Sequence, residues 1–451
     1  MRNLFIKILL LALLAAAGKS AGAQEEGVQE EGAQEGGPVK PTQPQGPETG
    51  QRVTPEKPEG ATMTAVPRGD TIADHRLGPF VVRPTIQAEF GYDSNVFIAS
   101  DTGEKVSSRL FNAAGELRMI LPGTSRHEFQ FDGKLGYKGF LDQDSQSYTE
   151  TSGEALYQLQ GDRNLIQIGE RYDVSRRRYS LEIDERVRFI SNEVRGFWEY
   201  SLTSGFGLRF GAHHSDFRFA SGTTVGGVNL ADQGNHQENG LELSGRIGLT
   251  RTIRVFGGGQ YRRTSFQEAD NPRDSTERIA EVGLEFSPEG AISGEAAVAY
   301  TSFRQEQIEE GSGSFSGLRA SADLRIRLGD SAGLTISGQR APQFSVLSAS
   351  VLDETLRAIL SFQAGEDLIV SGNVEVSRLK YRGAATILLP DGSSFVSNRT
   401  DKGLGFGASA VYTLRPSWGI IGTFRRLRRN SDVQELDYVD NEALIGVQIT
   451  L

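Results

Sequence analysis

The stretch Leu356–Lys380 reads LRAILSFQAGEDLIVSGNVEVSRLK. Apolar residues take every second position from Leu356 to Phe362 and again from Leu368 to Val376, on either side of the polar turn AGED. Side chains on a strand change face at every residue, so this pattern predicts a β-hairpin with one apolar and one polar face. Each arm is about ten residues long, which is enough for a tilted strand to cross a bilayer.

The same alternation recurs along the chain, as in Glu128–Lys138 and Leu318–Leu328. In both segments, charged and other polar side chains dominate the face opposite the apolar one. Such a polar face needs water, so it indicates a wet lumen and not a packed core. We therefore predict an all-β fold, a single transmembrane antiparallel up-and-down β-barrel.

About eighteen strands follow from the pattern and its turns. They are predicted at 81–97, 107–121, 126–141, 146–160, 164–179, 185–203, 206–220, 237–250, 253–267, 276–287, 291–305, 315–329, 332–345, 350–364, 368–382, 399–415, 418–430 and 436–451. Short turns alternate with long polar loops such as Ser221–Gln237 and Gly383–Asn398. This is the layout of an outer-membrane barrel, with short periplasmic turns and long external loops.

Two places break the alternation, near Glu170 and at Arg425–Arg429. Each is predicted to be either a β-bulge or the rim of the membrane. Trp198, Tyr200, Tyr412 and Trp418 lie near predicted periplasmic strand ends, where an aromatic girdle is expected.

Composition narrows the function. The 451 residues carry a formal net charge of -10, with a mean hydropathy of -0.36. This average also suits a barrel, in which only every second strand residue faces lipid. The absence of Cys excludes disulfides and thiolate sites, and five His leave little material for a metal site. The acidic balance argues against nucleic acid as a partner.

The N-terminus has the features of a targeting segment. Arg2 and Lys7 precede or interrupt an apolar run that ends at Ala17, and Ala21–Ala23 forms an A-x-A cleavage site. We predict a signal peptide over 1–23, a disordered Glu/Gly/Pro/Gln-rich periplasmic arm over 24–71, and the barrel over 72–451. The expected location is the outer membrane of a Gram-negative bacterium, with outer-membrane lipid as a partner.

The first strand carries a recognisable opening. Arg83-Pro84, followed by FGYDSNVF at 90–97, resembles the putative beta-barrel porin 2 family. The resemblance implies an outer-membrane barrel, often encoded with exopolysaccharide export machinery, and hence periplasmic polysaccharide-export proteins as partners. Asp93 and Asn95 within it share a face at the external strand end, where they either cap the loop or line the pore mouth.

The last strand ends on the final residue given. Its alternating apolar residues, with Gly446 before Ile449 and Leu451, look like the C-terminal assembly signal of outer-membrane barrels. The barrel assembly machinery is therefore an expected partner. Leu451 stands where an aromatic residue is usual.

Alternation also predicts which charged residues face the lumen. The candidates are Glu116, Arg118, Asp132, Lys134, Arg209, Glu281, Arg319, Asp323, Arg325, Arg327, Glu375 and Arg425. Rings of Arg select anions in pores, whereas interleaved carboxylates would neutralise them. Both interpretations remain open here.

The sequence predicts no enzyme, with no catalytic residues, no cofactor and no metal site. His213 lies near Ser215 and Asp216, but Asp216 is on the other strand face. The favoured function, implied by the family resemblance, is passage of exopolysaccharide or capsular polysaccharide to the cell surface. The alternatives are a diffusion porin for small solutes and a structural or adhesive barrel whose lumen is plugged by the long loops.

Overall fold

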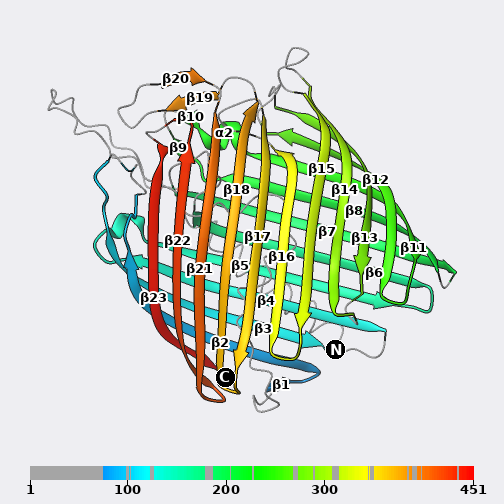
Figure 1. The fold of residues 1–451 in the computed structure, drawn as a ribbon, viewed down its shortest axis with the longest axis horizontal. Helices are drawn as coiled ribbons and strands as arrows, with labels where there is room; N and C mark the ends of the chain where they lie inside the picture. The colour runs from blue at the N-terminus through cyan, green and yellow to red at the C-terminus, as the bar shows by residue number, and fades with distance from the viewer. Residues whose placement is uncertain are drawn as a thin grey trace. The chain divides into compact units, whose positions relative to one another are not determined.

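The computed structural model describes residues 75–97, 101, 103–121, 126–177, 186–203, 205–225, 228–267, 273–287, 290–306, 314–343, 345, 350–382, 385–388, 394–397, 399–433 and 436–451. The predicted signal peptide and arm lie outside these residues. Over the described part the chain is one closed antiparallel barrel with very little helix (Figure 1).

Eighteen strands form the barrel wall, as the alternation predicted. They are β2 (Phe80–Asp93), β3 (Ser108–Leu121), β4 (His127–Phe140), β5 (Tyr148–Gln160), β6 (Asn164–Arg177), β7 (Val187–Thr203), β8 (Phe206–Phe219), β11 (His236–Gly248), β12 (Ile253–Phe266), β13 (Ser275–Phe286), β14 (Ile292–Gln305), β15 (Phe315–Leu328), β16 (Ala332–Gln343), β17 (Ser350–Ala364), β18 (Leu368–Arg382), β21 (Thr400–Arg415), β22 (Trp418–Ser431) and β23 (Tyr438–Thr450). Each pairs with its sequence neighbours, and β23 pairs with β2 to close the ring.

Smaller elements decorate the ends of the wall. The short strand β1 (His75–Leu77) folds back on β2. A 3-10 turn η1 (Asp144–Gln146) follows β4, and two small ribbons pair β9 (Thr224–Val225) with β10 (Val228–Asn229) and β19 (Ala385–Leu388) with β20 (Ser394–Ser397). The short helix α2 (Leu230–Gly234) lies between β10 and β11. No helix among the described residues is long and apolar enough to cross a membrane.

The hairpin predicted over Leu356–Lys380 lies within β17–β18. Its strands pair without interruption from Ser350↔Arg382 to Ala364↔Leu368. Gly365 begins the turn with a φ of 74°, a left-handed conformation that glycine adopts without steric cost. The strands continue beyond the predicted lipid-crossing arms, toward the end of the barrel with the longer loops. By the layout of outer-membrane barrels, that end is external.

The outward face is apolar where lipid would contact it. Leu318 is 67% exposed and Ile445 is 65% exposed, which places both on this face. The aromatic residues Trp198, Tyr412 and Trp418 are also exposed there, near the ends with short turns. Their position matches an interfacial girdle.

Neither predicted break in alternation is a bulge. The β5–β6, β6–β7 and β22–β23 ladders keep their register past Glu170 and Arg425–Arg429. The two register shifts among the described ladders occur elsewhere, at Ser201/Thr203 and Thr413/Arg415. Glu170 therefore simply faces outward. At Arg425–Arg429, arginines occupy both faces in the external half of β22, which corresponds to the rim alternative.

Candidate functional site: the lumen

The strand register places every predicted pore-lining residue on the face opposite the exposed apolar side chains, which is the lumen face. These residues are Glu116, Arg118, Asp132, Lys134, Arg209, Glu281, Arg319, Asp323, Arg325, Arg327, Glu375 and Arg425. What the alternation left open is how these charges are arranged relative to one another. In the structure half of them form ion pairs with residues of other strands: Arg118, Asp132, Lys134, Arg209, Arg319 and Arg425.

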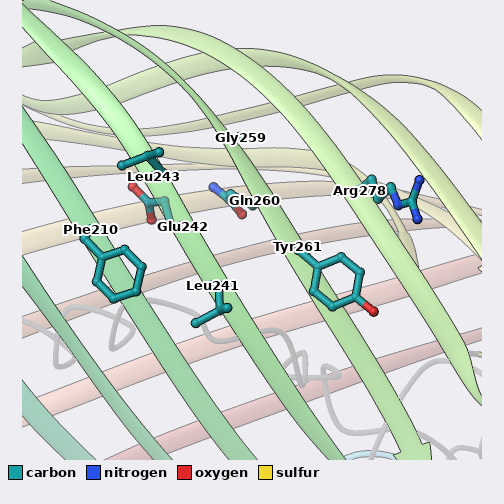
Figure 2. Close-up of a pocket in the computed structure, with 8 residues that line it drawn as sticks. All are labelled: Phe210, Leu241, Glu242, Leu243, Gly259, Gln260, Tyr261 and Arg278. Carbon is teal, nitrogen blue, oxygen red and sulfur yellow. The ribbon is translucent and has the colours of Figure 1, made fainter.

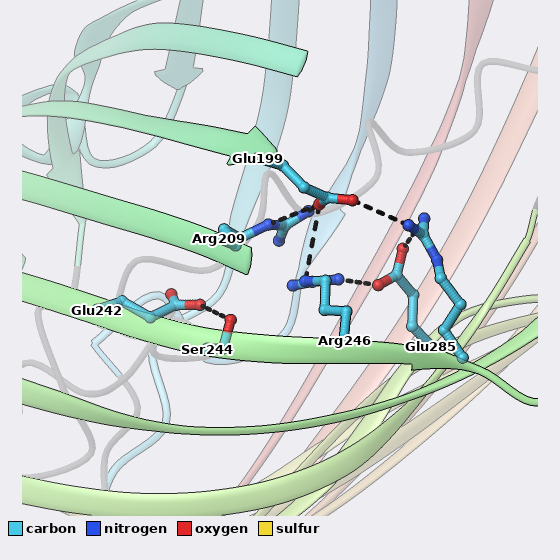
Figure 3. Close-up of polar contacts among 7 residues, drawn as sticks. Glu199, Arg209, Glu242, Ser244, Arg246 and Glu285 are labelled. Carbon is cyan, nitrogen blue, oxygen red and sulfur yellow. Dashed lines mark hydrogen bonds and ion pairs between the residues drawn. The ribbon is translucent and has the colours of Figure 1, made fainter. Parts of the chain in front are cut away.

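One ion-pair network is centred on Glu199 of β7 (Figure 3). Glu199 Oε2 lies 3.1 Å from Arg209 Nη2 on β8, and Glu199 Oε1 lies 2.9 Å from Arg254 Nη1 on β12. Arg246 of β11 contacts both Glu199 and Glu285. Glu285 also accepts from Arg254 at 2.7 Å. Two carboxylates thus hold three guanidiniums across five strands of the wall.

A second network lies on the same wall, nearer the external end. Arg262 Nη1 of β12 is 3.3 Å from Glu277 Oε2, and Arg319 Nη1 is 3.4 Å from Glu277 Oε1. Glu238 Oε1 lies 3.2 Å from Arg262 Nε and 3.0 Å from His213 Nε2. His213 therefore contacts a glutamate and not the Ser215 hydroxyl. Among the described residues, no group of three or more His, Asp or Glu side chains is arranged to hold a metal ion.

The opposite wall is also ion-paired. Arg118 Nε lies 2.6 Å from Asp132 Oδ1, and Lys134 Nζ lies 2.7 Å from Glu150 Oε1. Arg425 Nη2 is 3.5 Å from Glu442 Oε2. Each carboxylate reduces the field of its cationic partner toward a passing solute.

Three predicted lumen residues on β15 are arranged differently. Asp323, Arg325 and Arg327 form no ion pair with any described residue. Glu281 of β13 accepts a hydrogen bond from the Gln260 amide at 2.8 Å. Arg325 and Arg327 are exposed, so β15 presents these charges to the water of the lumen.

Asp93 and Asn95 sit at the external end of β2, both buried. The Asp93 carboxylate accepts the backbone N–H of Asn95 at 2.8 Å, which is the geometry of an Asx turn. The Asn95 amide donates to the Val439 carbonyl at 3.2 Å. These contacts tie the first loop to β23 and are those of a loop cap.

The residues of the predicted assembly signal lie at the seam. Gly446 of β23 pairs with Glu89, and a Cβ added to Gly446 would overlap the Ala88 carbonyl oxygen. The Leu451 N–H donates to the Pro84 carbonyl at 3.0 Å, and the Leu451 side chain is half exposed. The end of the chain thus extends the ladder that closes the barrel.

The external mouth holds apolar clusters that the alternation did not predict. Val187, Phe189, Phe217 and Phe219 lie on the lumen face near the external ends of β7 and β8, and Leu230 of α2 packs on them. Similarly, Val96 of the first loop packs on the lumen-facing Leu110, Phe140 and Leu444. The signal was present as aromatic residues at lumen-facing positions, such as Phe217 and Phe219. Such residues need an apolar partner inside the mouth.

Comparison with known families gives one match. The model of the putative beta-barrel porin 2 family matches residues 200–451, more than half of the chain. The chain belongs to the putative beta-barrel porin 2 family. This confirms the family named from the first strand, although the matched residues begin after that opening. The family and the fold are those of an outer-membrane porin-type channel.

Solved structures give weaker likenesses to this porin. The outer membrane protein opdK from Pseudomonas aeruginosa has a TM-score of 0.40 and 10% identity, over 82% of this chain and 99% of that chain. A BenF-like porin from Pseudomonas fluorescens has a TM-score of 0.42 and 10% identity, over 82% and 98%. OpdQ from Pseudomonas aeruginosa has a TM-score of 0.41 and 12% identity, also over 82% and 98%. The comparison with curated proteins gives no match.

Proposed function

We propose that the barrel is a diffusion channel for small hydrophilic solutes across the outer membrane. The observation that carries the proposal is a closed wall of eighteen strands with a charged lumen face. Barrels of 16–18 strands are wide enough to leave an aqueous channel. Charged side chains on a lumen face also require water beside them.

The ion pairs support weak discrimination between anions and cations. Arg209 and Arg319 both have a carboxylate oxygen within 3.4 Å. A ring of uncompensated arginines would attract anions, but a paired guanidinium presents little net field. The paired arrangement therefore favours neutral or weakly charged solutes over a dedicated anion pathway.

The external mouth favours small solutes over an extended polymer. Val96 and Leu230 pack on the lumen face at two places around the rim. At a third, the buried Arg429 donates from Nε to the Leu436 carbonyl at 2.8 Å, which holds the last loop against the wall. Each contact holds loop residues on the lumen face inside the mouth. An extended polymer passing through the mouth would have to displace them.

The proposal is tested by reconstituting the full-length porin in liposomes and measuring swelling in arabinose, glucose and raffinose. We expect rapid swelling that falls as the solute grows. A strain lacking the gene should keep its surface polysaccharide. If liposomes with the porin swell no faster than empty ones, and the deletion strain loses its polysaccharide, the diffusion function is wrong and the export implied by the family resemblance stands.

A further inference from the structure

Cationic side chains recur on the outer face near the external ends of the strands. They share a strand face with exposed apolar residues, as Arg304 does with Tyr300 and Val298 on β14. Other members are Arg263, Arg278, Arg340, Arg378, Lys402 and Arg426. They therefore lie at the external border of the lipid-facing surface, pointing away from the lumen.

Three of these cations converge on adjacent strands. Arg263 of β12 and Arg304 of β14 both pair with Thr276, one on each side of β13. Arg278 lies two residues further along β13 and faces the same way. Diagonal neighbours on one face of a sheet are roughly 7–8 Å apart, so the three guanidiniums can reach one ligand.

This basic triad has little internal compensation. Arg263 Nη2 lies 3.8 Å from Glu306 Oε1, which is a long distance for an ion pair. Arg278 and Arg304 are exposed and form no ion pair with any described residue. Over Ser275–Phe286 and Ile292–Gln305, which are described throughout, no other charged side chain faces outward. Unpaired guanidiniums at an apolar border call for an external anion, and a guanidinium binds phosphate oxygens in bidentate fashion.

An apolar hollow of about 390 Å³ begins beside Arg278 on the same outer face (Figure 2). Its walls include Phe210, Leu241, Leu243 and Tyr261. The hollow exists because Gly259 has no side chain on the outward face of β12. A Cβ added to Gly259 would come no closer than 3.6 Å to any neighbour, so the space above it is open.

We propose that this surface binds a phosphorylated lipid of the outer leaflet. Arg278 and Arg304, assisted by Arg263, hold the headgroup phosphate, and the hollow above Gly259 holds one acyl chain. The anion is part of a lipid because the apolar hollow and the cations adjoin on a face turned toward the bilayer. The inference does not depend on what crosses the lumen.

The test uses the full-length porin in detergent and measures binding of diphosphorylated lipid A by native mass spectrometry. The variant R278Q/R304Q removes the two cations of the triad that have no described ion pair. Its matched control is R325Q/R327Q, which removes two cations without described ion pairs from the lumen face. Each arginine near an anionic lipid surface is worth about 1 kcal/mol, so R278Q/R304Q should bind lipid A roughly 25-fold more weakly. The control should bind it as the unaltered porin does.

Two further arms separate a lipid from a free phosphate. The variant G259L fills the hollow without touching the arginines and should also weaken lipid A binding. Dephosphorylated lipid A should bind the unaltered porin as weakly as lipid A binds R278Q/R304Q. Equal binding of lipid A by both double variants would overturn the proposal. So would displacement of lipid A by inorganic phosphate alone together with unchanged binding by G259L.

Discussion

Glu199 Oε1 of β7 and Arg254 Nη1 of β12 lie 2.9 Å apart, although β8 and β11 stand between their strands. The contact is possible because both long side chains point into the lumen and cross the curved wall. Arg209 and Arg246, which come from the two intervening strands, share the same carboxylate. A single glutamate therefore compensates cations from three other strands.

Removal of the Glu199 charge should make the channel more selective for anions. In Glu199→Gln, Arg209 loses its described carboxylate partner, while Arg246 and Arg254 keep Glu285. One uncompensated charge at close range in water is worth about 1 kcal/mol, or about fivefold in local anion concentration at most. The measurement is the reversal potential of a planar bilayer under a salt gradient. Glu170→Gln removes the same charge from the outer face and should leave the reversal potential unchanged. A shift of equal size in both variants would contradict a role for the lumen charge.

Barrel closure should depend on the absence of a side chain at Gly446. A Cβ there overlaps the Ala88 backbone, which belongs to the neighbouring strand of the seam. Gly446→Ala should lower the free energy of unfolding by roughly 1–3 kcal/mol, the usual cost of overpacking. Urea unfolding in detergent, followed by the gel mobility of the folded barrel, measures it. Gly422 has open space around it, so Gly422→Ala should unfold at the same urea concentration as the unaltered porin. Coincident curves for all three proteins would refute this account of the seam.

The helix α2 should limit conductance through its packing on the mouth. Leu230 is buried among Val187, Phe189 and the two phenylalanines of β8. Replacing it by Ser removes about 1.5–3 kcal/mol of apolar burial and should release α2 from the wall. Single-channel recordings of Leu230→Ser should show a larger conductance. Asp232 is the exposed residue of the same helix, and Asp232→Asn should conduct as before. An unchanged conductance in Leu230→Ser would mean that α2 does not restrict the mouth.

A titration should detect the contact between Arg109 of β3 and Asp142, which lies in the turn after β4. Arg109 Nη2 lies 2.7 Å from Asp142 Oδ1, and its hydrogen bonds lower the pKa of Asp142 from 3.8 to about 2. A depressed folded-state pKa stabilises the fold above pH 3.8, and this contribution is lost as the pH falls toward 2. In Arg109→Gln the pKa of Asp142 should return toward its ordinary value. Carbon-13 NMR of the labelled carboxyl group measures it, and an unmoved titration would disprove the contact. Arg126→Gln, at the other end of the barrel, is the control and should leave the titration of Asp142 unchanged.

The wall of the barrel could be predicted well because its signal is local. The predicted strand 418–430 corresponds to Trp418–Ser431, and the predicted hairpin corresponds to β17–β18. One end was misplaced for a physical reason. The first strand was expected to reach position 97, but it ends at Asp93, whose carboxylate captures the Asn95 N–H and turns the chain. Only a backbone already bent at that point brings the two groups together.

The mouth could not be predicted, because its contacts depend on loops that return to the wall. Nothing in the local pattern distinguishes Leu230 from the other apolar residues of a long loop. Its partners lie on β7 and β8, earlier in the chain. They become neighbours of Leu230 only when the loop folds back onto the lumen face of these strands.

The sequence by itself determined the fold class, the number of strands and, where the alternation is regular, the face on which a charged residue lies. This follows because a strand side chain changes face at every residue, whatever its neighbours are. The tertiary structure alone decided which charges compensate one another, as with Glu199 and Arg254, and which cations remain uncompensated, as with Arg278 and Arg304. Those relationships depend on the register between strands and on the curvature that closure of β23 on β2 imposes. Both arise only when segments distant in sequence are brought into contact.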